Sequence, residues 1–151
     1  MPLPLFVGLS TAIAVGVCIV NGRKKKVFIS YYSKGDSHYK NLILAWAKSK
    51  KFKLNIEDYS TDTRIRSENE AYLKQKMRSQ IQKADYFIVF IGEDTHRRKW
   101  VSWEIEQAKK LNKTIIAVKE QRTHKSPTPL LKSGAIWVYK FSEENLRKAM
   151  S

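Results

Sequence analysis

The chain has 151 residues, a formal net charge of +15 and a single cysteine, Cys18. This length accommodates one domain that buries most of its apolar surface without cross-links, and one cysteine excludes both a disulfide framework and a thiolate metal cluster. The positive charge is compatible with nucleic acid, anionic lipid or an anionic nucleotide as a partner, and by itself it does not distinguish among them.

The N-terminal segment is predicted to be a membrane anchor. Residues 3–20 carry no charged side chain, and as a helix they would extend roughly 27 Å, close to the thickness of the hydrocarbon core. A basic cluster at residues 23–26 follows this segment, which orients the C-terminal side towards the cytosol. We therefore expect residues 1–22 to be a single-pass transmembrane helix in the cell membrane and residues 23–151 to be a cytoplasmic domain. The alternative is an apolar extension that contacts a partner or folds onto the domain.

The next part of the chain begins an alternation of strands and helices. Residues 26–32 predict a first strand, and residues 52–60 predict a second. Between them, an amphipathic helix capped by Ser37 is predicted to bury one stripe, formed by Tyr39, Leu42, Ile43, Trp46 and Ala47. Ser67 and Glu70 have the spacing of a capping box, and the helix that they start is expected to end near Ala84.

The strongest strand signal lies at residues 85–92, which are almost continuously apolar and are expected at the centre of the sheet. A helix at 97–112 follows, with Val101, Ile105 and Ala108 towards the core and Asn112 as its stop. Strands at 113–119 and 135–140 and a closing helix started by Ser142 complete the pattern. This order predicts an α/β fold with a five-stranded, mainly parallel sheet and helices on both faces.

Ligands of such sheets bind at the carboxyl ends of the strands. The loop after the first strand has one glycine and no phosphate-binding fingerprint, which excludes a classical dehydrogenase or P-loop enzyme. The three histidines lack the spacing of metal ligands, so we expect no metal site.

Trp100 and Glu104 are four residues apart and therefore adjacent on one side of a helix that starts at this edge. A carboxylate there can align a ribose and stabilise the oxocarbenium character that develops when a glycosidic bond breaks. Alternatively, a glutamate early in a helix complements the helix dipole, and tryptophans beside it simply pack. Periodicity alone favours this structural interpretation.

Four segments resemble, in their order and spacing, the Thoeris TIR-like family over residues 25–150: VFISYYSKGD, IEDYS, AYLKQKMRSQIQKADYFIVFIG and DTHRRKWVSWEIEQAKKLNKTIIAV. The stretch RRKWVSWEI is the most specific, because Trp100 and Glu104 fill the W-x-x-x-E spacing of TIR domains. The resemblance implies a flavodoxin-like TIR fold. It also implies an enzyme of anti-phage defence, an NAD glycohydrolase or ADP-ribosyl cyclase, that releases nicotinamide and makes an ADP-ribose-derived messenger.

The same resemblance implies site residues. Glu104 would be catalytic, and the predicted substrate-binding set is Trp100, Ser30, Tyr31, Ser33, Asp58, Ser60 and Arg97. NAD would be the substrate, and the resemblance implies no further cofactor or metal. Two departures from the family pattern are Val101, where TIR domains often have a small residue or cysteine, and the N-terminal membrane helix.

The expected partners are NAD, further copies of the domain, an effector protein that responds to the nucleotide product, and the membrane. A non-enzymatic, membrane-tethered adaptor module is the alternative function. We do not expect nucleic-acid binding, because the sequence shows neither aromatic interleaving nor a reading helix.

Overall fold

The computed structural model describes residues 24–32, 34–49, 56–58 and 69–151. The predicted anchor at residues 1–22 lies outside these ranges, as do Ser33 and Ser60. Within the described ranges, no helix has the length and apolar character that crossing a membrane requires.

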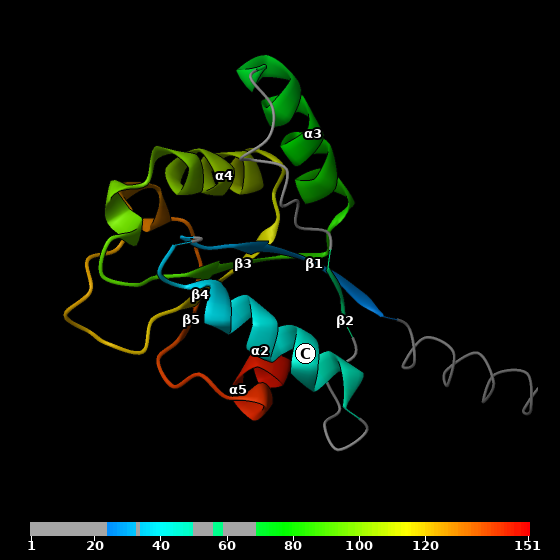
Figure 1. Cartoon of the computed structure of the whole chain (residues 1–151), viewed down its shortest axis with the longest axis vertical. Coiled ribbons are helices and arrows are strands. Elements are labelled where there is room, and N and C mark those ends of the chain that lie inside the picture. The colour runs from blue at the N-terminus through cyan, green and yellow to red at the C-terminus, as the bar shows by residue number, and fades with distance from the viewer. Residues whose placement is uncertain (1–23, 33, 50–55, 59–68) are drawn as a thin grey trace, which may run out of the picture.

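A five-stranded parallel sheet forms the centre of the domain, with the strand order β2-β1-β3-β4-β5 (Figure 1). The strands are β1 (Lys25–Ser30), β2 (Ile56–Asp58), β3 (Tyr86–Phe90), β4 (Thr114–Val118) and β5 (Ile136–Val138). This order is that of flavodoxin-like folds. The predicted fold class is therefore confirmed, including the central position of β3.

Helices cover both faces of the sheet, with α3 (Glu70–Lys83) and α4 (Lys99–Lys110) on one face and α2 (Ser37–Lys48) and α5 (Glu143–Ala149) on the other (Figure 1). Two short 3-10 helices, η2 (Thr95–Arg97) and η3 (Thr128–Leu130), lie in the loops after β3 and β4. β3 supplies both apolar layers, Ile88 and Phe90 to the α2 side and Phe87 and Val89 to the α4 side. Because both of its faces are covered, its sequence is continuously apolar.

Several local predictions are changed by tertiary contacts. Leu42 was expected in the buried stripe of α2, yet it is 41% exposed. Lys40 is buried instead, because its ammonium group lies 3.3 Å from the Asp58 carboxylate. The N-cap of α3 is Asn69, whose side chain accepts a hydrogen bond from the Tyr72 amide at 3.1 Å, and the proposed cap Ser67 lies outside the described residues.

Other helix ends agree more closely with the sequence. Ser142 caps α5, as predicted, by accepting a hydrogen bond from the Asn145 amide at 3.1 Å. Asn112 has a φ of 54°, the left-handed conformation with which helices commonly end, so its prediction as a stop is confirmed. Ser37, in contrast, is the first residue of α2, and Asp36 occupies the N-cap position without making a side-chain cap.

Candidate active site

Glu104 is fully buried, at 0% exposure, on the side of α4 that faces the sheet. Val101, Ile105 and Ala108 share this side and pack in the core, as predicted. Glu104 is the sixth residue of α4, and it therefore lies beyond the first turn, where a carboxylate complements the helix dipole. Since burying a carboxylate is costly, this position argues against the helix-dipole interpretation and makes Glu104 a candidate for chemistry.

Ser30 and Tyr31, at the carboxyl end of β1, point towards opposite faces of the sheet. Phe28, two residues before Ser30, belongs to the apolar layer beneath α4, so the alternation of a strand directs the fully buried Ser30 towards the same layer. Tyr31 belongs to the layer beneath α2, and the Lys40 ammonium lies 5.7 Å from the centre of its ring. Of these two predicted residues, only Ser30 shares a layer with Glu104.

Asp58 also lies on the α2 side. Its carboxylate pairs with Lys40, and both side chains are largely shielded from solvent. Ile56, two residues earlier in β2, packs in the same layer, as strand alternation requires. The structure therefore groups Asp58 with Tyr31 and Lys40 and separates it from Glu104 by the sheet.

The helix α4 and the residues just before it supply the rest of the candidate site. Trp100 is half-buried and packs edge to face on Trp103, with ring centres 5.9 Å apart. The Arg97 side chain is 72% exposed and its guanidinium lies 3.9 Å from the Asp94 carboxylate. Its neighbour Arg98 turns inward, with its guanidinium carbon 3.8 Å from the centre of the Tyr32 ring. The predicted residue Arg97 does not join the site residues.

Three loops at this edge are joined by side-chain contacts. The Thr95 hydroxyl accepts a hydrogen bond from the Gly92 amide at 2.8 Å and donates one to the Asp36 carboxylate at 3.3 Å. A Cβ at Gly92 would lie 2.6 Å from both Asp36 carboxylate oxygens, so a larger residue here would displace the Asp36 side chain. His124, in the loop after β4, has Nδ1 3.4 Å from the Ile91 carbonyl oxygen. Sequence reasoning missed Asp36 because nothing in a turn sequence marks a contact with a distant loop.

Buried polar atoms without hydrogen-bond partners occur at the same edge. In the described part of the chain they include Ser30 Oγ, His96 Nδ1 and Arg98 Nε. These atoms come from the end of β1, from η2 and from the N-cap of α4. A buried polar group that lacks a partner costs about 1–3 kcal/mol, and a bound polar ligand can supply the missing partners. All three atoms lie at the carboxyl edge of the sheet, where the helix that carries Glu104 begins.

The protonation of Asp36 makes the stability of the domain depend on pH. Burial raises the pKa of Asp36 above its ordinary value of 3.8, although the Thr95 hydrogen bond and the nearby His38 and His124 act in the opposite direction. Because the folded state holds this proton more tightly than the unfolded state, the stability contributed by Asp36 is fully present at low pH. It is lost as the pH rises through the folded-state pKa.

We therefore expect Asp36→Asn, which retains an acceptor for Thr95, to gain stability relative to the wild type as the pH increases. Urea denaturation of both proteins at about pH 4 and about pH 7 measures this difference. A difference in unfolding free energy that is constant, or that falls with pH, would contradict the prediction.

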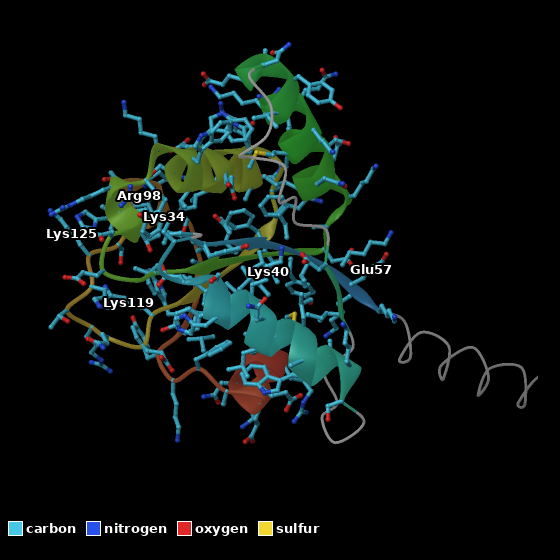
Figure 2. All side chains as sticks on the ribbon, viewed as in Figure 1. Lys34, Lys40, Glu57, Arg98, Lys119 and Lys125 are labelled. Atoms are coloured by element: carbon cyan, nitrogen blue, oxygen red, sulfur yellow. The ribbon has the colours of Figure 1, made fainter. Side chains whose placement is uncertain are left out.

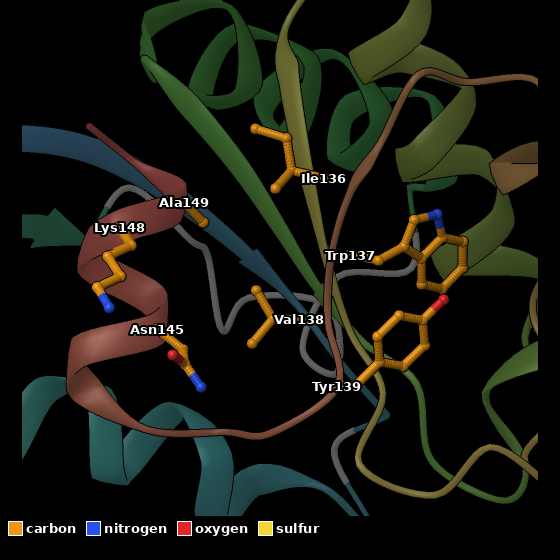
Figure 3. Close-up of a pocket in the computed structure, with 7 residues that line it drawn as sticks. All are labelled: Ile136, Trp137, Val138, Tyr139, Asn145, Lys148 and Ala149. Atoms are coloured by element: carbon orange, nitrogen blue, oxygen red, sulfur yellow. The ribbon is translucent and has the colours of Figure 1, made fainter.

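Two surface pockets lie away from this edge. One, of about 340 Å³, lies between β5 and α5, with Asn145, Lys148 and Ala149 on one side of the strand and the stacked Trp137 and Tyr139 rings on the other (Figure 3). Another, of about 470 Å³, lies near the amino ends of β3 and β4, and Asp85 is among the described residues that line it. Neither pocket is lined by Glu104 or by the loops described above. The candidate active site is placed at the carboxyl edge on the burial of Glu104 and the position of its helix.

Residues 28–125, which run from β1 to the loop after β4, match the family described as Thoeris protein ThsB, TIR-like domain. The chain belongs to this family. No curated protein matches the sequence of this TIR-like domain significantly. The matched range contains Glu104 and every predicted substrate-binding residue.

Solved structures share the fold of this TIR-like domain. A conserved protein from Enterococcus faecalis has a TM-score of 0.61 at 12% identity, with 85% of this chain and 98% of that chain covered. The CMP N-glycosidase BcmB from Clostridium botulinum has a TM-score of 0.55 at 16% identity, covering 83% and 98%. A 2-desoxiribosyltransferase from Leishmania mexicana has a TM-score of 0.50 at 16% identity, covering 64% and 65%. At these identities the similarity establishes the fold alone.

Proposed function

We propose that this TIR-like domain cleaves the N-glycosidic bond of NAD, releasing nicotinamide and forming an ADP-ribose-derived messenger for anti-phage signalling. The observation that carries the proposal is the fully buried carboxylate of Glu104 on the helix that starts at the carboxyl edge, where buried polar atoms have no partners among the described residues. Membership of the Thoeris TIR-like family supports it. Two proteins of similar fold are named for glycosidic chemistry, a CMP N-glycosidase and a desoxiribosyltransferase.

The proposed reaction breaks the bond between C1′ of the ribose and the nicotinamide nitrogen. Both bonding electrons leave with nicotinamide, whose ring becomes neutral, and positive charge develops on C1′ and the ring oxygen. The Glu104 carboxylate would stabilise this charge and align the ribose hydroxyls, and Ser30 Oγ is available to bind one of them. Water that adds to C1′ yields ADP-ribose and a proton, whereas a group of the same nucleotide that adds there yields a cyclic product.

Chromatography after incubating the purified full chain with NAD tests this function. We expect nicotinamide and one ADP-ribose-containing nucleotide to appear in equal amounts. If copies of the domain complete one another's sites, the rate per protomer should increase with protein concentration. Absence of nicotinamide, with the protein both concentrated in solution and clustered on vesicles, would contradict the proposed activity.

The adaptor alternative is favoured by one feature of the surface. Large apolar side chains remain exposed around β5, including Leu131, Ile136 and Tyr139. Such side chains can form a contact with another copy of the domain or with an effector protein. If the domain is an adaptor, its complexes should form equally well with the Glu104→Gln variant, and NAD should remain intact.

We also propose that residues 1–22 anchor the domain at the cytosolic face of the cell membrane. Their apolar length and the basic residues that follow support this arrangement. We expect the full chain to remain with membranes after an alkaline wash and a chain that lacks residues 1–22 to appear in the supernatant. Recovery of the full chain in the supernatant would contradict the anchor.

A further inference from the structure

Arg98 is held in a fixed orientation at the carboxyl edge of the sheet. Its guanidinium carbon lies 3.8 Å from the centre of the Tyr32 ring, which places the guanidinium against the ring. Its Nε is buried and has no hydrogen-bond partner within the described residues. The side chain is therefore positioned before any ligand arrives, and its donors are not all used by the protein.

Two lysines lie at the same edge as Arg98, alongside the carboxylates of Asp36 and Asp94. Figure 2 shows Lys34, Arg98 and Lys125 at the side of the domain where the carboxyl ends of the strands lie. None of the three forms an ion pair within the described ranges. Lys34 is two residues from Tyr32, which contacts Arg98, and Lys125 follows His124, which contacts the residue before Gly92. Cations without carboxylate partners attract an anionic ligand to this edge.

We propose that Arg98 binds the diphosphate of a nucleotide substrate, with Lys34 and Lys125 adding to the attraction. A planar guanidinium can donate two parallel hydrogen bonds to a phosphate, which a flexible ammonium group cannot do. Arg98 precedes Glu104 by six residues, a rise of roughly 9 Å along a helix. In NAD the diphosphate is joined directly to the nicotinamide ribose, so one substrate can reach both residues. This inference rests on the proposed function for the identity of the substrate.

Arg97 provides a matched control for this proposal. It has the same side chain and the adjacent position, but it extends into solvent and pairs with Asp94. Arg97→Gln and Arg98→Gln therefore remove the same charge from the same loop. Only the second variant removes a guanidinium that packs on the Tyr32 ring and has a buried Nε.

The test compares NAD with nicotinamide riboside, which has the scissile bond but no phosphate. For Arg98→Gln we expect the KM for NAD to increase about 10- to 100-fold, the effect of losing a charged hydrogen-bond partner. The KM for nicotinamide riboside should stay unchanged. Arg97→Gln should behave like the wild type with both substrates. An equal loss with both substrates, or equal effects of the two variants, would overturn the role of Arg98.

Calorimetric binding of ADP-ribose gives a readout that does not depend on catalysis. We expect the Kd of ADP-ribose to increase about 10- to 100-fold in Arg98→Gln and to stay unchanged in Arg97→Gln. If ADP-ribose binding depends on Arg98 but NAD is not cleaved, the proposed function fails and the phosphate site stands. If NAD is cleaved with an unchanged KM by Arg98→Gln, the phosphate site fails and the proposed function stands.

If Arg98→Gln does not fold, Arg98→Lys tests the proposed phosphate contact instead. It retains the charge and the aliphatic stem but loses the planar donor pair. The expected result is a higher KM for NAD than in the wild type, with the KM for nicotinamide riboside unchanged. A lysine variant with wild-type KM values for both substrates would overturn the proposal.

Discussion

Replacing Glu104 by glutamine is expected to reduce nicotinamide release from NAD by about 100-fold or more, the usual cost of removing a positioned group that stabilises transition-state charge. Glutamine has almost the same size, and it removes a buried carboxylate rather than adding one, so the fold should be retained. Chromatographic quantification of nicotinamide at saturating NAD measures the effect. Thermal unfolding of the variant verifies that the domain remains folded.

Glu106→Gln is the control for this experiment. Glu106 lies on the same helix, two residues further on, and is half-buried outside the core. The substitution is chemically identical, and we expect the rate of nicotinamide release to be unchanged. Robust cleavage of NAD by Glu104→Gln, or an equal loss in Glu106→Gln, would remove Glu104 from its proposed role.

Phe87→Ala is expected to produce the largest loss of stability, about 3–5 kcal/mol in the free energy of unfolding. Phe87 is fully buried in β3, the central strand, and its ring stacks on that of Phe28 with centres 5.6 Å apart. Removing the ring leaves a cavity between the sheet and the α3 and α4 layer. Since domains of this size are stable by about 5–15 kcal/mol, the variant should unfold at much lower urea concentration.

Tyr72→Ala provides the comparison for an aromatic side chain at the surface. Tyr72 is 56% exposed on α3, and its backbone amide, which Asn69 caps, is retained in the variant. We expect a change of no more than about 0.5 kcal/mol. Similar urea midpoints for Phe87→Ala and Tyr72→Ala would show that Phe87 does not hold the two layers together.

Local patterns in the sequence were sufficient for the order of elements and for much of the core. Residues 85–92 are almost continuously apolar because β3 is covered on both faces, so their central position could be predicted. The spacing of Val101, Ile105 and Ala108 likewise identified the buried side of α4 and placed Glu104 beside it. These signals are local, because helix and strand periodicity depends only on neighbouring residues.

Which side chains are buried by contacts between distant segments could be seen only in the tertiary structure. Leu42 has the spacing of a core residue and is exposed, whereas Lys40 of α2 is buried and pairs with Asp58 of β2. Ion pairs of this kind have no signature in either segment alone. For this reason the buried stripe predicted for α2 was wrong at Leu42 and correct at Ile43.

For the candidate active site, the chain's own pattern indicated the carboxyl edge, the pair of Trp100 and Glu104, and the family. It did not indicate that Ser30 shares a layer with Glu104 while Asp58 lies across the sheet, because that depends on strand pairing and register. Nor did it distinguish Arg98 from Arg97. The two arginines are adjacent and chemically identical in the sequence, and the tertiary structure places only Arg98 against the Tyr32 ring.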